Sequence, residues 1–248
     1  MIKTLLKLIR DQFRNIGYDV RKMGRTGENP FADMRHFLKG ERSPLILDVG
    51  ANVGQSVTHF KRTFPGATIH SFEPSPTTFA TLSKNCARIP GVTPWNLAAG
   101  SSNGKLPLLE NTCSDMTSFL QPGRDGWGAI QKTTIVDVVT LDEFAREKGI
   151  NFIHVLKSDT QGYDLEVFKG AASLLSSNNI ALIYCEVTFS EMYKDSAKFD
   201  QIFTYLTGHN FTLVSFYRKY FQNETLGWTD MLFINNTHNQ HPVPSQPS

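Results

Sequence analysis

The chain has 248 residues, a formal net charge of +2 and 40% hydrophobic residues. This length and composition suffice to bury the core of one α/β domain, so no second domain is needed. The charge is too small, and too evenly spread, for a surface that follows nucleic-acid phosphates, so we expect no nucleic-acid partner. The three cysteines, Cys86, Cys113 and Cys185, form no Cys-x-x-Cys pair. Their spacing indicates neither a disulfide framework nor a zinc site, and it favours a reducing, cytoplasmic compartment.

The first residues predict a basic amphipathic helix. Apolar side chains recur at helical spacing from Ile2 to Ile16, with lysines and arginines between them. The segment lacks the continuous apolar run of a membrane span and the cleavage site of a signal peptide. Two interpretations stay open: the helix packs on its own domain, or it makes a peripheral contact with an anionic membrane. We assign residues 1–40 to this helix and its lead-in, residues 41–237 to the α/β domain, and the polar, proline-rich residues 238–248 to a disordered tail.

A glycine turn follows the first predicted strand. Residues 45–49 are apolar except for Asp48, and the next five read Gly-Ala-Asn-Val-Gly. Gly50 can adopt a positive φ that a Cβ would penalise, and small residues here let the backbone approach a ligand. The turn lacks the Gly-x-Gly-x-x-Gly spacing of a dinucleotide site, which disfavours a Rossmann oxidoreductase and favours a smaller, cationic cofactor.

The second predicted strand, residues 67–72, ends in Glu73, whose carboxylate can accept both hydroxyls of a ribose. Residues 48–54 and 72–74 together resemble the first two signatures of class I methyltransferases, which use S-adenosylmethionine. The resemblance implies cofactor-binding roles for Asp48, Gly50, Asn52, Gly54 and Glu73. For Asn52 two roles stay open, because its side chain could hold the amino-acid end of the cofactor or tie down its own turn.

The rest of the chain alternates helix and strand signals, as a parallel-rich sheet covered on both faces requires. The resemblance implies a Rossmann-like α/β fold with a mostly parallel sheet, a C-terminal antiparallel hairpin and helices on both faces. Ser75 and Pro76 supply an N-cap and a first turn for a helix over residues 77–88. Further strands are predicted at residues 92–99, 105–110, 133–141, 152–158, 180–187, 211–217 and 231–235, with a helix at 196–207.

Residues 156–171 read Leu-Lys-Ser-Asp-Thr-Gln-Gly-Tyr-Asp-Leu-Glu-Val-Phe-Lys-Gly-Ala. This run closely resembles the long signature of the FkbM family of methyltransferases, and the resemblance extends over about residues 45–187. Ser158 replaces the usual branched apolar residue, and Gln161 stands where many members carry Glu. The resemblance implies methyl transfer to a hydroxyl of a sugar, glycan or natural product, with a small-molecule or glycan acceptor as the partner.

Three residues at strand ends are candidates for catalysis. Ligands of open α/β sheets bind beyond the carboxyl ends of the strands, where Asp159 and Glu186 follow predicted strands. Asp159 is the first candidate for the general base and Glu186 the second; alternatively, Asp159 caps the following helix, or both acids share a divalent cation. Lys157 lies on the same strand face as Asp159, where it could stand near the acceptor or pair with an acid. No histidine has the spacing of a metal ligand or a nucleophilic triad, so no metal site is predicted.

Two rival functions stay open. A ribose 2′-O-methyltransferase of RNA would use similar lysines and acids, although the weak net charge and the lack of an RNA-binding motif disfavour it. A binding module that kept the cofactor fold without catalysis is the other rival. The sequence does not determine the oligomeric state.

Overall fold

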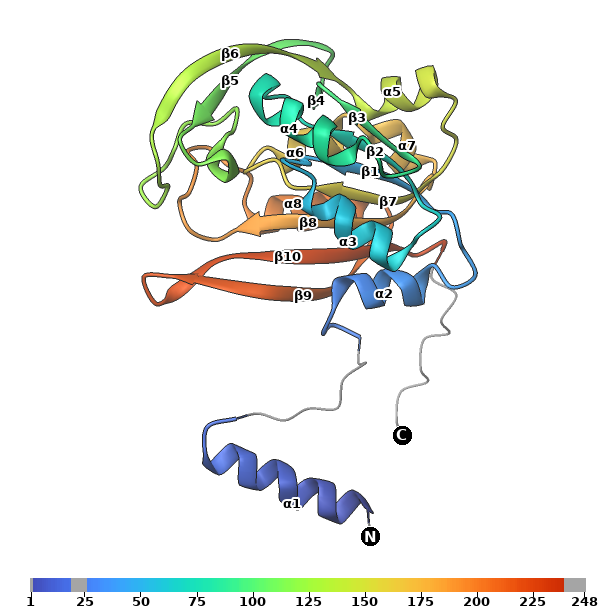
Figure 1. Ribbon diagram of the computed structural model, residues 1–248, viewed down its shortest axis with the longest axis vertical. Helices are drawn as coiled ribbons and strands as arrows, with labels where there is room; N and C mark the ends of the chain where they lie inside the picture. The colour runs from blue at the N-terminus through green and yellow to red at the C-terminus, as the bar shows by residue number, and fades with distance from the viewer. Residues whose placement is uncertain (1, 19–25, 239–248) are drawn as a thin grey trace.

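The structure is a computed structural model and describes residues 2–18 and 26–238 (Figure 1). The first helix, α1 (Ile2–Asn15), forms where the apolar spacing predicts it. The apolar side chains of Ile9, Phe13 and Ile16 are exposed on this helix and just after it. Within the described ranges, no helix is long and apolar enough to cross a membrane. The predicted tail lies outside the described residues from position 239 onward.

A seven-stranded sheet forms the centre of the fold, in the order β3-β2-β1-β7-β8-β10-β9. Its five parallel strands are β1 (Leu45–Val49), β2 (Thr68–Phe72), β3 (Val92–Trp95), β7 (Ile153–Ser158) and β8 (Ile180–Thr188). The hairpin strands β9 (Phe211–Gln222) and β10 (Thr225–Asn235) complete one edge, with β10 antiparallel to both neighbours. The predicted fold class is confirmed. The chain order reverses between β1 and β7, and this switch point is where open α/β sheets bind ligands.

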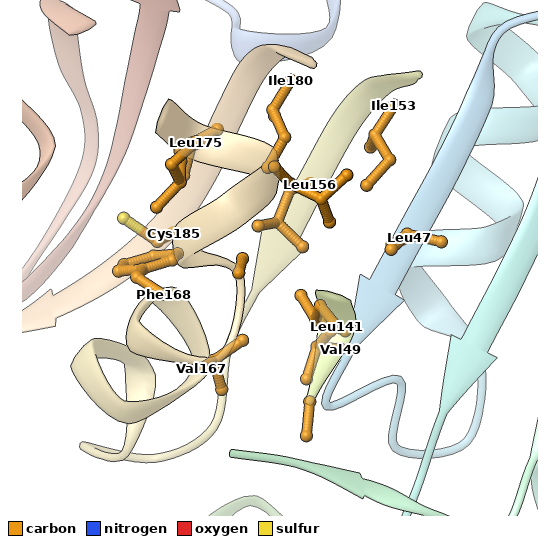
Figure 2. Packing of buried hydrophobic residues seen from close by; sticks show 14 of the residues in the cluster. Leu47, Val49, Leu141, Ile153, Leu156, Val167, Phe168, Leu175, Ile180 and Cys185 are labelled. Atoms are coloured by element: carbon orange, nitrogen blue, oxygen red, sulfur yellow. The ribbon is translucent and has the colours of Figure 1, made fainter. Parts of the chain in front are cut away.

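Helices cover both faces of the sheet because successive strand residues point to opposite sides. On one face α5 (Leu141–Lys148), α6 (Asp164–Lys169), α7 (Ala172–Ser176) and α8 (Phe199–Gly208) pack on Leu47 and Leu156, as Figure 2 shows in part. The other face is covered by α2 (Pro30–Phe37), α3 (Gln55–Thr63) and α4 (Pro76–Cys86). These helices pack on Ile46 and Val155, which precede Leu47 and Leu156 in their strands and point to the opposite side.

Helix α2 was not predicted and lies within the segment assigned to the lead-in. Asn29 caps it by accepting hydrogen bonds from the backbone N–H groups of Phe31 and Ala32, and Pro30 occupies the first turn. Met34 is fully buried in the same cluster as β1 and α3. The Tyr217 hydroxyl of β9 donates to Asp33, which ties α2 to the far edge of the sheet. Residues 30–37 thus contribute to the core of the domain.

The strand predicted over residues 92–99 is wrong in one respect, because it is two strands in different sheets. β3 ends at Trp95, and β4 (Ala98–Ala99) joins β5 (Gly104–Asn111) and β6 (Ile130–Val139) in a three-stranded sheet. Between them Asn96 donates to the backbone carbonyls of Glu73 and Pro74, which satisfies carbonyls that a continued strand would leave free. A short 3-10 helix, η1 (Ser114–Met116), follows β5.

Candidate active site

A cavity of about 770 Å³ opens at the carboxyl ends of the parallel strands. It runs from the end of β2 across β1, β7 and β8 to the hairpin, and the segment after β5 also contributes to its wall. Of the predicted site residues, six line this cavity: Gly50, Asn52, Glu73, Lys157, Asp159 and Glu186. Asp48 and Gly54 are not on its wall. The sheet therefore gathers side chains that are far apart in the sequence.

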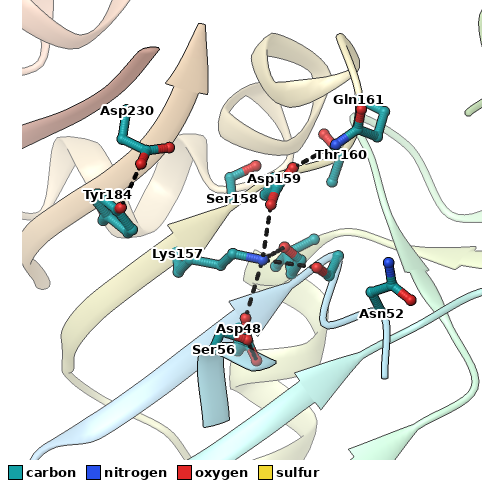
Figure 3. A network of polar contacts seen from close by, with 12 residues as sticks. Asp48, Asn52, Ser56, Lys157, Ser158, Asp159, Thr160, Gln161, Tyr184 and Asp230 are labelled. Carbon is teal, nitrogen blue, oxygen red and sulfur yellow. Dashed lines mark hydrogen bonds and ion pairs between the residues drawn. The ribbon is translucent and has the colours of Figure 1, made fainter. Parts of the chain in front are cut away.

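Lys157 is the centre of the polar network drawn in Figure 3. Its ammonium group donates to the carbonyl oxygen of Gly50 at 2.7 Å and lies 3.3 Å from Asp48 Oδ1 and 3.6 Å from Asp159 Oδ2. Burial alone would lower the pKa of Lys157, but Asp48 and Asp159 outweigh burial and raise that pKa above its usual value. Lys157 is therefore a permanent cation that holds the glycine turn against the end of β7.

Asp48 lies beneath the glycine turn, away from the cavity wall, and supports the turn through its hydrogen bonds. Its side chain is fully buried, and its Oδ2 accepts hydrogen bonds from the hydroxyls of Ser56 on α3 and Ser71 on β2. Strand register explains this meeting, because Asp48 pairs with Ser71 on one side and with Lys157 on the other. Gly54 has a φ of 97° at the start of α3. Both residues shape the turn that lines the cavity.

Asp159 directly follows β7 and keeps 37% of its side chain exposed. Its Oδ1 accepts a hydrogen bond of 2.7 Å from the Gln161 amide. It is not the cap of the next helix, α6, whose N-cap residue is Tyr163 and which has no side-chain cap. Asp164 in the first turn accepts from the backbone N–H of Thr160 and from the hydroxyl of Ser158. Ser158, which departs from the family signature, therefore has a buried partner. Asp159 is left facing the cavity.

Glu186 lies across the cavity from the glycine turn and has an acidic neighbour that the sequence analysis missed. In the strand register Glu186 pairs with Asp230, whose Oδ2 accepts a hydrogen bond of 2.8 Å from Tyr184. Burial, followed by the charges of Asp159 and Asp230, raises the pKa of Glu186 well above its usual value. Burial also raises the pKa of Asp230 to about 6. The end of the cavity at β8 and β10 is therefore lined by two carboxyl groups, Glu186 and Asp230, that are paired in the strand register.

The signal for Asp230 was present in the sequence, since it is a lone acid in an apolar strand, as Glu186 is. The predicted last strand began one residue too late to include it. Within the part of the chain that the structure describes, no three His, Cys, Asp or Glu side chains are grouped so that they could hold a metal ion.

Glu73 forms the other end of the cavity. Its Oε2 accepts from the backbone N–H of Asn52 and its Oε1 from that of Ser75, which links the glycine turn to the end of β2. Burial raises the pKa of Glu73 to about 7, against the lowering effect of these two hydrogen bonds. The group is thus close to half ionised at neutral pH.

Asn52 combines two features that a ligand would explain. Its φ is 47°, and its side-chain oxygen is buried with no hydrogen-bond partner among the described residues. Its amide nitrogen lies 3.5 Å from the Ser114 hydroxyl, at the limit of a hydrogen bond. A buried, unsatisfied oxygen costs about 1–3 kcal/mol unless some donor reaches it. Asn52 therefore offers a prepared acceptor on the wall of the cavity.

The arrangement defines a class: a cofactor-binding α/β domain with its ligand site at the switch point of a parallel sheet. The chain belongs to the family of the methyltransferase FkbM domain, which matches residues 48–213. The fold is that of the class I methyltransferases. A solved structure of the methyltransferase FkbM from Methylobacillus flagellatus KT aligns with a TM-score of 0.55 at 17% identity, over 84% of this chain and 48% of that one.

Two relatives come from different organisms. The chain is 27% identical over 151 residues to the hexuronic acid methyltransferase AglP of Haloferax volcanii, covering 58% of this chain and 57% of that protein. It is 24% identical over 212 residues to the 31-O-demethyl-FK506 methyltransferase FkbM of Streptomyces tacrolimicus, covering 73% of this chain and 78% of that protein. The match to the Haloferax volcanii enzyme thus spans little more than half of that enzyme's length.

We predict that Gly50→Ala destabilises the fold by about 2–4 kcal/mol, because a Cβ would add both overpacking and left-handed strain. A Cβ at this position would lie 1.9 Å from the backbone oxygen of Asp159, at a φ of 72°. Thermal unfolding followed by circular dichroism measures the change. Gly208→Ala is the matched control, because a Cβ there meets nothing within 4 Å. Equal melting temperatures for both variants would contradict the role given to Gly50.

Proposed function

We propose that this protein transfers a methyl group from S-adenosylmethionine to a hydroxyl oxygen of a sugar or natural product. The observation that carries the proposal is one continuous cavity with Glu73 and the glycine turn at one end and Asp159, Glu186 and Asp230 at the other. Membership in the methyltransferase FkbM domain family supports the chemistry. The two relatives, a hexuronic acid methyltransferase and a 31-O-demethyl-FK506 methyltransferase, support a hydroxyl acceptor.

The residues at the β1 and β2 end fit this cofactor. Glu73 would accept the ribose hydroxyls, and the unpartnered Asn52 oxygen would accept from the ammonium of the methionine part. Gly50 would let the backbone approach the ligand closely, and its carbonyl oxygen is held by the Lys157 ammonium group. S-adenosylmethionine supplies a methyl group on a positively charged sulfur.

The residues at the β7 and β8 end would act on the acceptor. Holding the hydroxyl oxygen in line with the methyl group can supply roughly 7–11 kcal/mol of the barrier reduction. The hydroxyl must also lose its proton as it takes the methyl group, and Asp159 is the carboxylate placed to receive it. A positioned general base contributes about 10²–10⁴-fold.

We predict that Glu73→Ala weakens S-adenosylmethionine binding at least about tenfold, or about 1.4 kcal/mol, by removing the ribose acceptor. Binding by the wild type should also depend on pH. The pKa of Glu73 is raised to about 7, and ribose hydroxyls bind better to the ionised carboxylate. Affinity should therefore rise as the pH increases through about 7, by roughly tenfold from pH 6 to pH 8.

Isothermal calorimetry at several pH values checks both expectations. Glu73→Gln is the control, because an amide of the same shape does not titrate and should give a flat pH profile. Wild-type affinity in Glu73→Ala would remove the ribose assignment. Stabilisation by nicotinamide dinucleotides but not by S-adenosylhomocysteine would replace the methyltransferase with an oxidoreductase.

For Asp159→Asn we predict turnover lower by about 10²-fold or more, while S-adenosylmethionine affinity stays within a few-fold. The amide keeps the shape of the side chain and loses its ability to take a proton. Methyl transfer from labelled cofactor to small glycosides, lipid-linked saccharides and RNA, each assayed separately, measures the effect and identifies the acceptor class. Near-normal turnover in the variant would exclude Asp159 as the base, and labelling of RNA alone would favour the ribose 2′-O-methyltransferase.

A chelator separates two roles of Asp159. If EDTA leaves turnover unchanged, the carboxylate acts directly as a base. If EDTA abolishes turnover and magnesium or manganese restores it, Asp159 is a ligand of the ion.

We also propose that α1 binds an anionic membrane surface. The support is the exposure of Ile9, Phe13 and Ile16 together with the basic residues that alternate with them in the sequence. We expect the protein to sediment with vesicles that contain phosphatidylserine, and less so in high salt. Ile9→Asp with Phe13→Asp should abolish this binding without lowering methyl transfer to a soluble acceptor. Failure of the wild type to bind such vesicles would contradict the proposal.

A further inference from the structure

Two residues outside the predicted site make contact with Asp159 or with its partner. The Gln161 amide nitrogen donates to Asp159 Oδ1 at 2.7 Å, and the Tyr193 hydroxyl donates to the Gln161 amide oxygen at 2.6 Å. Tyr193 is fully buried in a cluster with Met116 and Met192. The contacts form a chain from this cluster, through one amide group, to the carboxylate that faces the cavity.

The Tyr193 hydroxyl supports the orientation that the Asp159 carboxylate imposes on the Gln161 amide. An ionised carboxylate can only accept hydrogen bonds, so the amide nitrogen points at Asp159, and the amide oxygen on the other side accepts from the Tyr193 hydroxyl. If the amide were reversed, the Gln161 amide oxygen would face Asp159 Oδ1, and the two oxygens would repel each other. The observed orientation is thus the one that favours an ionised Asp159.

The backbone around Gln161 is also held in place. Gln161 has a φ of 56° and Gly162 one of 88°. The Ser118 hydroxyl donates to the Gln161 carbonyl oxygen at 2.7 Å, and a Cβ on Gly162 would lie 3.2 Å from the Tyr193 ring. Ser118 and Tyr193 belong to the segments after β5 and β8, so both segments fix the same turn.

We propose that Gln161 and Tyr193 are positioning residues for Asp159, an inference that rests on the proposed methyl transfer. They occupy Oδ1 and so orient the carboxylate. Oδ2 accepts no hydrogen bond from the described residues, since Lys157 lies 3.6 Å away, and it is the oxygen that takes the acceptor proton. The base is thus assembled by the segments after β5 and β8.

The test compares Tyr193→Phe with the wild type in a pH series of kcat. Loss of the phenol removes the hydrogen bond that holds the amide oxygen of Gln161. The amide then donates less firmly to Asp159, which favours the protonated carboxyl group, so the acid limb should move to higher pH. We expect kcat near neutral pH to fall about 5–20-fold while cofactor affinity stays unchanged. Tyr205→Phe is the control, because the Tyr205 hydroxyl contacts the carbonyl oxygen of Phe168, away from the cavity.

Gln161→Glu gives an independent second variant, since it adds a negative charge beside Asp159 and should move the acid limb in the same direction. The other titratable groups around Asp159 stay unchanged in both variants: Lys157 on β7, Asp164 on α6, Tyr184 and Glu186 on β8, Asp230 on β10 and Tyr220 on β9. Differences between variants therefore report on the chain of contacts from Tyr193. If Tyr193→Phe does not fold, Gln161→Glu decides the question.

A carbon-13 titration of the Asp159 carboxyl group in the protein alone separates this inference from the proposed function. A titration midpoint that rises in both variants supports the positioning role even if no acceptor is methylated. Wild-type midpoints and pH profiles in folded Tyr193→Phe and Gln161→Glu would overturn it. A wild type that methylates no acceptor would overturn the proposed function alone.

Discussion

The buried positive charge of Lys157 is the constraint on which the rest of the site depends. A cation without water must be compensated, and here two carboxylates and two backbone carbonyls compensate it. These four groups belong to β1, the glycine turn and the end of β7. Because all of them contact the same ammonium group, Lys157 fixes the position of the glycine turn. Removing the ammonium group would leave Asp48 buried and unpaired, a loss of about 3–5 kcal/mol for such pairs. The structural role of Lys157 is therefore sufficient to explain its place in the signature.

The sequence predicted the parts of the site that depend on local rules. Parallel strands end at one edge, so acids that follow apolar runs must meet there, and Glu73, Asp159 and Glu186 do line one cavity. Side-chain alternation likewise placed Lys157 and Asp159 on one face. The Ser75 cap of α4 also formed as its local pattern indicates, with the Ser75 hydroxyl accepting from the backbone N–H of Thr78. The cap and the alternation need only neighbours within one strand or turn, and the meeting of the acids needs only the parallel direction of the strands.

Most of the missed features depend on contacts between distant parts of the chain, although Asn29 and Pro30 give α2 a local start signal. Helix α2 is short, and its bond between Asp33 and Tyr217 joins residues 184 positions apart. The sequence did not predict the full length of the hairpin strands, for two reasons. The tip of the hairpin lacks a buried face, with Phe221 67% exposed, so it shows no apolar pattern. The chain also turns there at positive φ through Asn223 and Glu224, without a glycine that would mark the turn. Tyr193 lies outside the helices and strands, in an isolated antiparallel bridge with Pro122, so pairing and packing with the segment after β5 bring it to Gln161.

Asp159 is the point at which two separate networks meet. Oδ2 of Asp159 lies near Lys157, which contacts the glycine turn on the proposed cofactor side. Oδ1 accepts a hydrogen bond from Gln161, which in turn accepts one from Tyr193 on the proposed acceptor side. The backbone of the same residue sets the glycine requirement, because its carbonyl oxygen fills the space that a side chain at Gly50 would need. A displacement of either wall of the cavity would therefore move the carboxylate. Because alignment accounts for much of the rate of the proposed methyl transfer, a carboxylate held from both walls of the cavity is the arrangement that this reaction requires.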